Sequence, residues 1–409
     1  MRALSSEPVE RAVARLEELG RISDHPEFLT RSFLSPANLR AARLVGEWMA
    51  ELGMEVEHAV DGTMRGMLAG TAPGAAPLLL GSHLDTVVDA GRFDGALGIV
   101  VALAAVEALR QEGRALPFPM HVLAFSDEEG SRFHTTYLGS RSLLGPLDAG
   151  TLSRRDEAGE SLASVLRAEG WHEGAREMRY RSGETLGYVE VHIEQGRVLQ
   201  EEGLAVASVS SIAGQSRLAV TLHGRADHAG TTPMGLRRDA LGGAAACVLA
   251  AEELARAEEG AVVTVGKLKL HPDVSNTIPQ RARLTVDLRH AVDAVRERLR
   301  GELERLFREV AEGRGLELEW EVVQESAAVP CDGRLREKMM EAVGSTTGRP
   351  FSMMSGAGHD AVALSARMPV AMLFVRCREG LSHHPDEYAT PEDVEVGIMV
   401  LREFLLGLA

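Results

Sequence analysis

The sequence has few cysteines, no long apolar run and no excess of positive charge. Cys247, Cys331 and Cys377 are an odd number of cysteines and lie far apart, so they indicate neither a disulfide framework nor a thiolate metal motif. The most apolar stretch, GIVVALAAV, is too short to cross a bilayer, and the charged segment 1–20 lacks the apolar core of a signal peptide. These absences predict a cytoplasmic protein with no membrane partner.

The charge balance excludes another class of partner. Lys and Arg total 44 against 60 Asp and Glu, a net charge of −16, which argues against a surface for nucleic acid or anionic lipid. Hydrophobic residues make up 45% and charged residues 25%, as in ordinary globular proteins. A chain of 409 residues exceeds what one hydrophobic core usually serves, so we expect two domains.

From about residue 8 to 130 the sequence alternates helical and strand patterns. NLRAARLVGEWMAELG predicts an amphipathic helix closed by Gly53, APLLLG a buried strand, GALGIVVALAAVEALRQEG a helix and MHVLAFS the next strand. This alternation predicts a mixed, mostly parallel sheet with helices on both faces. In such sheets ligands gather beyond the carboxyl ends of the strands, where His83 and the DEEG segment at 127–130 lie.

The middle of the chain follows a different pattern. Strand-like segments (ASVSSIAGQSRLAVTLHG, AVVTVGKLKLHP, RARLTVDLRH and LELEWEVV) alternate with two amphipathic helices near 239–256 and 292–312. They predict a compact α+β insert with a four-stranded sheet and two helices on one face. The α/β rhythm returns near residue 331. We therefore predict a discontinuous catalytic domain, 1–212 and 331–409, interrupted by a lid and dimerisation domain at 213–330.

Seven histidines and acids lie in glycine-rich, non-periodic stretches at element edges. Imidazole and carboxylate are ligands that Zn²⁺ and Mn²⁺ accept, and two such cations can share one bridging carboxylate. Simpler roles exist: Asp94 could cap the helix that starts near Gly95, and the pair Glu128–Glu129 could be a solvated loop. The group as a whole predicts a two-metal site. Its members are His83, Asp85, Asp94, Glu128, Glu129, His192 and His383.

Nine motifs, in order along almost the whole chain, carry a family resemblance. They are GSHLDT, GRFDGALG, DEEGSRF, VHIEQG, ADHAGTTPMGLRRDA, SNTIP, DLR, SGAGHDA and FVRCREGLSHHPDEY. Together they resemble the M20-type metal-dependent amidohydrolases, in the branch of N-carbamoyl-L-amino acid hydrolases and allantoate amidohydrolases. The histidine of HIEQG favours this branch, because peptidases and deacetylases of the wider family tend to carry an acid there. One departure is His134-Thr135-Thr136, where many relatives carry a glycine.

The resemblance implies a binuclear centre of Zn, Mn, Co or Ni. His83, Asp94 and His192 would hold one metal; Asp94, Glu129 and His383 would hold the other, with Asp94 bridging. Asp85 would orient His83 through a hydrogen bond. Glu128 would be the general base, and because neighbouring residues of an extended loop point to opposite sides, it can face water while Glu129 binds metal. His384 occupies the variable position of the family pattern G-x-S-H-x-P, which selects His383 as the ligand. His359 is either a structural histidine at a helix start or faces substrate.

The resemblance also implies a substrate site. His228 would stabilise the tetrahedral oxyanion, often from a partner subunit, although in isolation it resembles a surface histidine. Asn276 and Arg289 would clamp a carboxylate, although the alternation of RLTVDLR makes Arg289 an exposed edge residue. Gln195, Gln215 and the backbone at Gly358 are further candidates for holding a ureido group.

These roles predict hydrolysis of a terminal ureido C–N bond next to a carboxylate, releasing ammonia and carbon dioxide. The candidate substrates are allantoate, slightly favoured, and N-carbamoyl-L-amino acids. Two alternatives remain: a dipeptidase or N-acyl-amino acid deacylase on the same fold, and a non-catalytic carboxylate-binding paralogue. A half-exposed sheet edge in the insert and a His228 acting in trans predict a homodimer.

Overall fold

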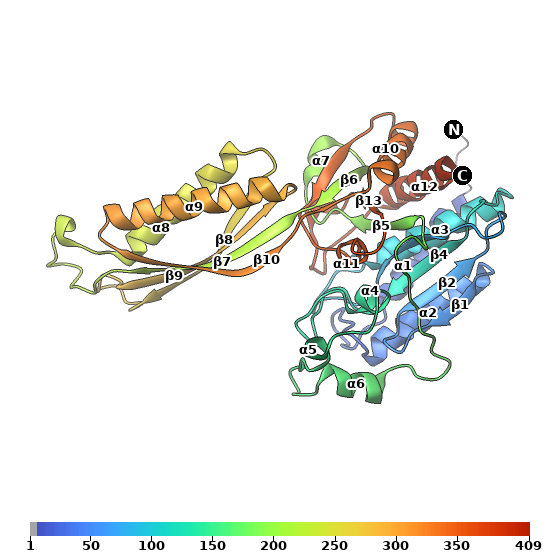
Figure 1. Ribbon diagram of the computed structural model, residues 1–409, viewed down its shortest axis with the longest axis horizontal. Coiled ribbons are helices and arrows are strands. Elements are labelled where there is room, and N and C mark those ends of the chain that lie inside the picture. The colour runs from blue at the N-terminus through green and yellow to red at the C-terminus, as the bar shows by residue number, and fades with distance from the viewer. Residues whose placement is uncertain (1–5) are drawn as a thin grey trace. The chain divides into compact units, whose positions relative to one another are not determined.

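The structure is a computed structural model that describes residues 6–409 (Figure 1). The chain divides into two compact units. The larger contains the chain up to Ser210 with Cys331–Met353 and Gly358–Ala409, and the smaller contains Ser211–Pro330 with Met354–Ala357. The charged segment expected at 1–20 continues as α1 (Ser6–Gly20), and its first five residues lie outside the described part. Within residues 6–409 no helix combines the length and apolarity needed to cross a membrane.

A mixed sheet forms the centre of the larger unit. In the described chain it has nine strands, in the order β1-β2-β4-β3-β5-β13-β6-β11, with β12 paired to β6. The four middle strands β4, β3, β5 and β13 are parallel, and β1, β2, β6 and β11 pair antiparallel with their neighbours on the path. The strands are β1 (Glu55–His58), β2 (Met64–Leu68), β3 (Leu78–His83), β4 (Met120–Phe125), β5 (Gly187–Ile193), β6 (Val206–Ile212), β11 (Val329–Pro330), β12 (Ser352–Ser355) and β13 (Val370–Val375).

Helices cover both faces of this sheet, as predicted. Residues 96–109 of α3 (Ala96–Gln111) are buried on every side, which explains the apolar run GIVVALAAV as a core helix. Val189, Val191 and Ile193 of β5 join the core that α3 covers, whereas Glu190 and His192 alternate to the other face, near α11 (Asp360–Leu364). The other helices are α2 (Pro36–Glu51), α4 (Leu138–Ser142), α5 (Ala149–Leu152), α6 (Leu162–Glu169), α7 (Val198–Glu202), α10 (Gly333–Thr347) and α12 (Pro391–Leu408).

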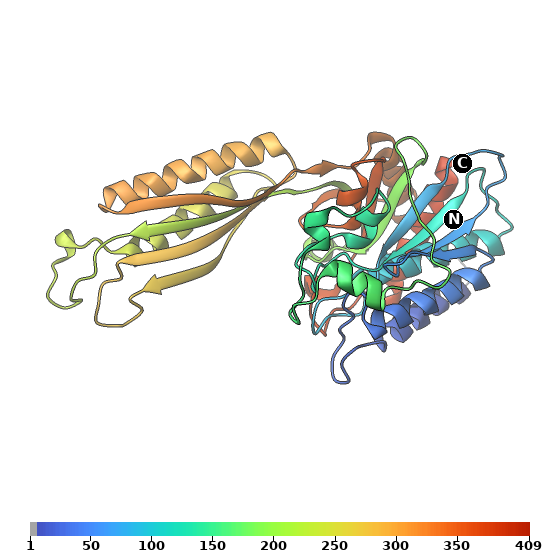
Figure 2. The same cartoon turned by 60° about the horizontal axis from the view of Figure 1, so that its bottom comes forward.

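The smaller unit is the α+β fold that the insert predicts (Figure 2). Its antiparallel sheet has the order β10-β7-β9-β8, with β7 (Gly214–His223), β8 (Val262–His271), β9 (Arg281–His290) and β10 (Glu317–Ser326). Alternate residues of β7 and β9, such as Val220 and Leu284, pack against α8 (Ala240–Ala257) and α9 (Asp293–Gly313). This period-2 burial is what the strand patterns indicate.

The alternative role of Asp94 as a helix cap is wrong. Asp94 is not a helix cap, because the N-cap of α3 is Gly95, with φ of 65°, and the carboxylate of Asp94 faces histidines instead. A Cβ at Gly95 would lie 2.5 Å from the imidazole of His83. Two features therefore require glycine at position 95: the positive φ of the backbone and the close approach of the His83 ring.

Candidate metal centre

Three predicted ligands meet at the carboxyl ends of the central strands. His83 is the last residue of β3, His192 lies in β5, and Asp94 lies just before α3. Asp94 Oδ1 lies 3.2 Å from Nε2 of His83 and 3.2 Å from Nε2 of His192, and the two Nε2 atoms are 3.4 Å apart. All three side chains are buried, and they can hold one ion together.

The hydrogen bonds of these histidines fix which nitrogen is free. His192 Nδ1 lies 2.9 Å from the carbonyl of Ile193, which only accepts, so Nδ1 carries a proton and Nε2 is the nitrogen that can offer a lone pair to a cation. His83 Nδ1 likewise faces the carbonyl and carboxylate of Asp85, at 3.1 and 3.3 Å. Ligands bound to zinc at about 2.0–2.1 Å in tetrahedral geometry lie about 3.3–3.4 Å apart. The donor atoms present therefore fit a cation.

The charges around this group favour ionised Asp94. Burial works against its negative charge, but His192 and His83 overcome this and hold the pKa of Asp94 well below its usual range. Burial likewise opposes a positive charge on His83, yet hydrogen bonds to Asp85 and Asp94 raise the pKa of His83 well above its ordinary value. A carboxylate that stays ionised while buried is what a cation ligand requires.

A second group shares Asp94. Asp94 Oδ2 lies 3.5 Å from His383 Nε2, and that nitrogen lies 3.2 Å from Glu129 Oε1. The hydrogen bond to Glu129 raises the pKa of His383 to about 9. Asp94 thus directs one oxygen to each group, and the five predicted ligands form two adjoining sets. His384 belongs to neither set, and its Nδ1 accepts from the amide of Asp386.

Asp85 connects the first group to the loop that carries the predicted base. Its carboxylate faces His83 Nδ1 and accepts hydrogen bonds from the amides of Glu128 at 2.8 Å and Glu129 at 3.1 Å. One side chain therefore sets the orientation of a ligand imidazole and the path of the backbone at Glu128 and Glu129.

Glu128 is a buried carboxyl group beside the two sets. Burial raises its pKa well above the usual value; His83 opposes the shift, and Glu129, Asp360 and Asp85 add to it. A carboxyl whose pKa is moved toward neutrality can both accept and release a proton near physiological pH.

Two residues around the ligands, Ser382 and Glu387, were not predicted. Ser382 Oγ donates to Asp94 Oδ2 at 2.6 Å. Gln195, expected to hold a ureido group, donates through Nε2 to the same oxygen at 2.8 Å. Glu387 accepts hydrogen bonds from the amides of Phe93 and Asp94. Ser382 and Glu387 lie in the LSHHPDE motif, so the motif that singled out His383 contained the signal for both.

Three further buried acids adjoin the site. Asp127, Glu190 and Asp360 are almost fully buried, and burial raises the pKa of each. Glu190 accepts from Ser82 Oγ and from the amide of Ala361. Their spacing in sequence gave no sign that they would gather.

His359 and His134 differ in placement. His359 is buried, with its ring centroid 4.6 Å from that of His192, and burial together with the charge of His192 lowers its pKa well below the usual value. His359 stands at the N-cap of α11, but its side chain makes no capping hydrogen bond. The side chain of His134 is exposed, at a residue with φ of 52°.

Gly358 lies in the larger unit against an aromatic side chain. A Cβ there would lie 2.0 Å from Tyr137 Oη, so only glycine allows this approach. Burial raises the pKa of Tyr137, with Glu128 adding to the shift, and the phenol therefore stays protonated. Gln195 is also constrained, with φ of 57° and a buried Oε1 that makes no hydrogen bond in the described structure.

His228 lies in the smaller unit and is exposed. Its Nδ1 accepts hydrogen bonds from the amides of Gly230 and Thr231, at 3.1 and 3.2 Å. Because Nδ1 accepts, the neutral ring must carry its proton on Nε2, which is then a hydrogen-bond donor directed away from its own loop. Asn276 is exposed in the adjoining loop, and its carbonyl accepts from the amide of Ala229.

Arg289 and Gln215 share one acid in the smaller unit. Arg289 donates to both carboxylate oxygens of Asp287, at 2.9 and 3.0 Å, and Gln215 Nε2 donates to Asp287 Oδ2 at 2.7 Å. Although burial opposes it, these donors lower the pKa of Asp287. Asp287 was not predicted as a site residue, although it opens the DLR motif. Asp287 fixes the plane of the Arg289 guanidinium and accepts from its Nε and Nη2.

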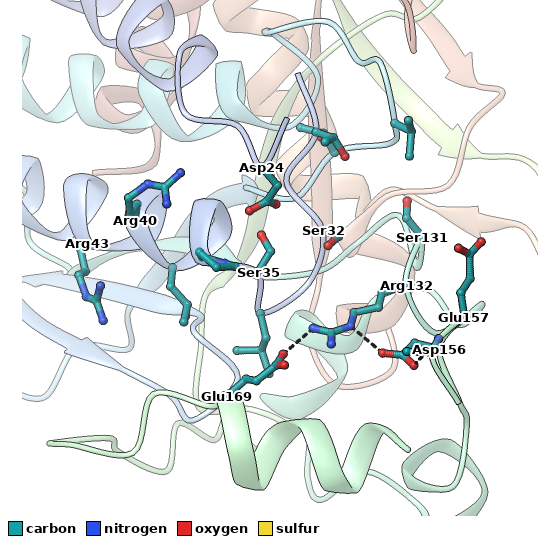
Figure 3. A pocket seen from close by; sticks show the side chains of 17 residues that line it. Asp24, Ser32, Ser35, Arg40, Arg43, Ser131, Arg132, Asp156, Glu157 and Glu169 are labelled. Atoms are coloured by element: carbon teal, nitrogen blue, oxygen red, sulfur yellow. Dashed lines mark hydrogen bonds and ion pairs between the residues drawn. The ribbon is translucent and has the colours of Figure 1, made fainter. Parts of the chain in front are cut away.

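A separate hollow of the larger unit contains none of the metal-ligand residues (Figure 3). Arg132 in its wall is neutralised by Asp156 at 3.1 Å and Glu169 at 2.8 Å. Arg40 and Arg43 line it as well, and Arg43 lies over the ring of Trp171. Both acids and bases line the wall, and we assign no ligand to it.

Comparison with known proteins places these motifs among hydrolases. Residues 79–407 match the family described as Peptidase family M20/M25/M40. Over 97% of this chain and 89% of the relative, the sequence is 38% identical to allantoate deiminase 2 of Glycine max. It is 39% identical to N-carbamoyl-L-amino acid amidohydrolase of Geobacillus stearothermophilus, over 98% of both chains. A hydantoinase/carbamoylase family amidase from Burkholderia multivorans superposes with a TM-score of 0.90 at 32% identity, covering 99% and 98% of the two chains.

Proposed function

The chain belongs to peptidase family M20/M25/M40, and from this premise we propose that it is a metal-dependent amidohydrolase that cleaves the terminal ureido C–N bond of a small carboxylate. Relatives named for allantoate and for N-carbamoyl-L-amino acids, similar over nearly the full chain, support this substrate class. The observation that carries the proposal is the pair of ligand groups sharing Asp94, with the buried Glu128 beside them.

The ligand groups suit two divalent cations, zinc, manganese, cobalt or nickel. We assign His83, Asp94 and His192 to one ion and Asp94, Glu129 and His383 to the other. Bound cations supply Lewis acidity, which makes water easier to deprotonate and a ureido carbonyl easier to attack. Asp85 keeps His83 in the tautomer that leaves Nε2 free for this role.

Glu128 moves the proton in the proposed reaction. Its carboxylate accepts a proton from the attacking water and delivers it to the departing nitrogen. The nitrogen therefore leaves as neutral ammonia rather than as an amide anion when the C–N bond breaks. The raised pKa of Glu128 supports this role, because a more basic carboxylate takes the proton from water more completely and holds it until the nitrogen departs.

The smaller unit supplies candidate substrate groups. Arg289 and Asn276 would bind the carboxylate, with Asp287 holding the guanidinium plane and Gln215. His228 would donate its Nε2 proton to the oxygen that becomes negative in the transition state, a contribution of roughly 3–4 kcal/mol. In the larger unit, Gln195 and the backbone at Gly358 would hold the ureido group.

Ammonia release from a panel of allantoate and N-carbamoyl-L-amino acids tests the proposal, with N-acetyl amino acids in parallel. We expect ureido turnover that falls about 100- to 10,000-fold in Glu128→Gln, with bound metal retained. Turnover of N-acetyl but not N-carbamoyl substrates would assign a deacylase instead. No turnover together with no stoichiometric metal after dialysis would assign a binding paralogue.

We also propose a homodimer and a cytoplasmic location. Strand β8 is an edge of the small sheet, and its exposed Val262 and Leu268 lie on an edge that a second copy can cover. Sedimentation of the wild type and of Leu268→Lys tests this: we expect a dimer that dissociates in the variant. A monomeric, fully active wild type would contradict it and would place His228 in cis. Three unpaired, buried cysteines support a reducing compartment.

A further inference from the structure

Arg31 is a buried arginine without an acidic partner in direct contact. It lies between α1 and α2, is 1% exposed, and forms no ion pair within residues 6–409. Its Nε donates to the carbonyl of Leu84 at 2.9 Å, and its Nη1 to the carbonyls of Leu19 at 2.5 Å and Ile22 at 3.3 Å. Burying a guanidinium on carbonyls alone is costly, so the position calls for an explanation.

The backbone of Arg31 is also tied to the segment that follows β3. The amide of Arg31 donates to Thr86 Oγ1 at 2.9 Å, and the amide of Thr86 donates to the carbonyl of Arg31 at 3.0 Å. Together with the bond to Leu84, these contacts hold the residues on both sides of Asp85. The conformation of residues 84–86 is therefore set from the α1–α2 segment, more than 50 residues earlier in the chain.

Asp85 lies between the two residues that Arg31 holds, and it makes three contacts in the metal centre. It faces His83 Nδ1 and accepts from the amides of Glu128 and Glu129. Burial lowers the pKa of Arg31 to about 10, and the negative charge of Asp85 opposes that shift, so the guanidinium remains charged at neutral pH.

We propose that Arg31 is a positioning residue of the metal centre: it fixes residues 84–86 so that Asp85 holds His83, Glu128 and Glu129 in place before any ion or substrate arrives. Arg31 contacts neither ligand group, and it acts through Leu84, Thr86 and Asp85. The expected change in kcat rests on the proposed function, whereas the expected change in zinc affinity rests only on the two ligand groups.

The test compares Arg31→Met with Arg15→Met. Arg15 is a matched control, because it is also a buried arginine, in α1, but it pairs with Glu107 and lies over Trp48, and within residues 6–409 it makes no hydrogen bond to residues 84–86. Both changes remove a buried guanidinium, so both should lower the melting temperature. Only Arg31→Met should weaken zinc binding, by about 10- to 100-fold in competition between the loaded full-length enzyme and a chelator, with kcat reduced and KM unchanged.

Two further variants keep the proposal testable if Arg31→Met does not fold. Thr86→Val removes the hydroxyl that accepts from the Arg31 amide and should weaken zinc binding in the same direction. Arg31→Lys keeps the charge but cannot reach three carbonyls, so its zinc affinity should lie between wild type and Arg31→Met.

The outcomes separate the two proposals. A wild type that binds no stoichiometric zinc, or releases no ammonia from ureido substrates, overturns the proposed function. A wild type with both properties, in which Arg31→Met matches Arg15→Met in zinc affinity and kcat, overturns the role of Arg31 alone. If Arg31→Met is unfolded, wild-type zinc affinity in Thr86→Val overturns it equally.

Discussion

At the scale of single residues, Asp94 has the most demanding position. Its two carboxylate oxygens face different sets of ligands, and Ser382 and Gln195 donate to the oxygen on the His383 side. These hydrogen bonds restrict rotation of the carboxylate, so that it stays aligned with both groups. No other residue among the described ligands belongs to both sets.

Asp94→Asn should therefore empty both groups at once. The amide is nearly isosteric but carries no charge and offers one acceptor instead of two. Replacing groups that merely support a ligand costs about 10- to 100-fold in metal affinity, so the loss here should exceed about 100-fold. Metal content per chain after dialysis, measured by mass spectrometry, checks this.

His383→Ala is the matched control, because His383 belongs to one group only and is 46% exposed. We expect it to lose the ion of the second group and to keep that of the first. Equal metal content in Asp94→Asn and the wild type would contradict the shared role of Asp94.

The sequence singled out the residues that gather at the candidate metal centre better than the residues that support them. His83, Asp94, Glu129, His192 and His383 could be singled out because polar residues in glycine-rich stretches at strand ends are unusual. The LSHHPDE motif contains Ser382 without showing which residue it contacts, and Arg31 lies in no motif. Their partners lie 288 and 53 residues away along the chain, and only the folded backbone brings them together.

At the scale of elements, β4 carries a histidine whose ionisation is coupled to folding. Burial and the nearby charge of Arg65 lower the pKa of His121 to about 4, and its Nδ1 lies 2.7 Å from Tyr180 Oη. In the unfolded chain a histidine has a pKa of about 6.5. Between these values the unfolded state binds a proton that the folded state does not, so stability falls as the pH decreases from 6.5 to 4.

His121→Gln should remove this dependence. At pH 5 the wild type should lose about 2 kcal/mol relative to pH 7.5 through His121 alone, and the variant should be spared that loss. Urea unfolding at the two pH values measures it. His172→Gln, at an exposed histidine of the same unit, is the control and should retain the wild-type loss. An identical pH dependence in wild type and His121→Gln would contradict the argument.

Long, periodic elements were predicted, and short ones were not. The patterns identified β3, β4, α3 and the strands and helices of the insert because burial repeats along each of them, although they joined β6 of the larger sheet to β7 as one segment. They did not identify β1, β2 or the short helices α4 to α6. These elements bury few residues of their own and are held by neighbours from distant parts of the chain, so their sequences carry little periodicity.

At the scale of the whole molecule, the two units have separate cores. Both proposed metal sites lie in the larger unit, and a ligand stabilises only the fold that binds it. Removing metal with a chelator should therefore lower the melting temperature of the larger unit and leave that of the smaller unit unchanged. At an ion concentration of 100 times Kd, the stabilisation lost is about 2.7 kcal/mol per site.

Differential scanning calorimetry of the full chain with and without chelator provides the measurement. His383→Ala should show a smaller decrease on chelation than the wild type, because one site is already missing. A chelator that shifts both transitions equally, or neither, would contradict the assignment of the metal centre to the larger unit.

The strand order has a consequence for how the protein is made. Strand β13 lies between β5 and β6 in the sheet, yet it is synthesised more than 150 residues after both. The smaller unit is almost continuous in sequence and can fold as it leaves the ribosome, whereas the central sheet must wait for β13. His383 emerges later still. The chain therefore has its full set of proposed ligands only near the end of translation, and the proposed ions can be captured together only then.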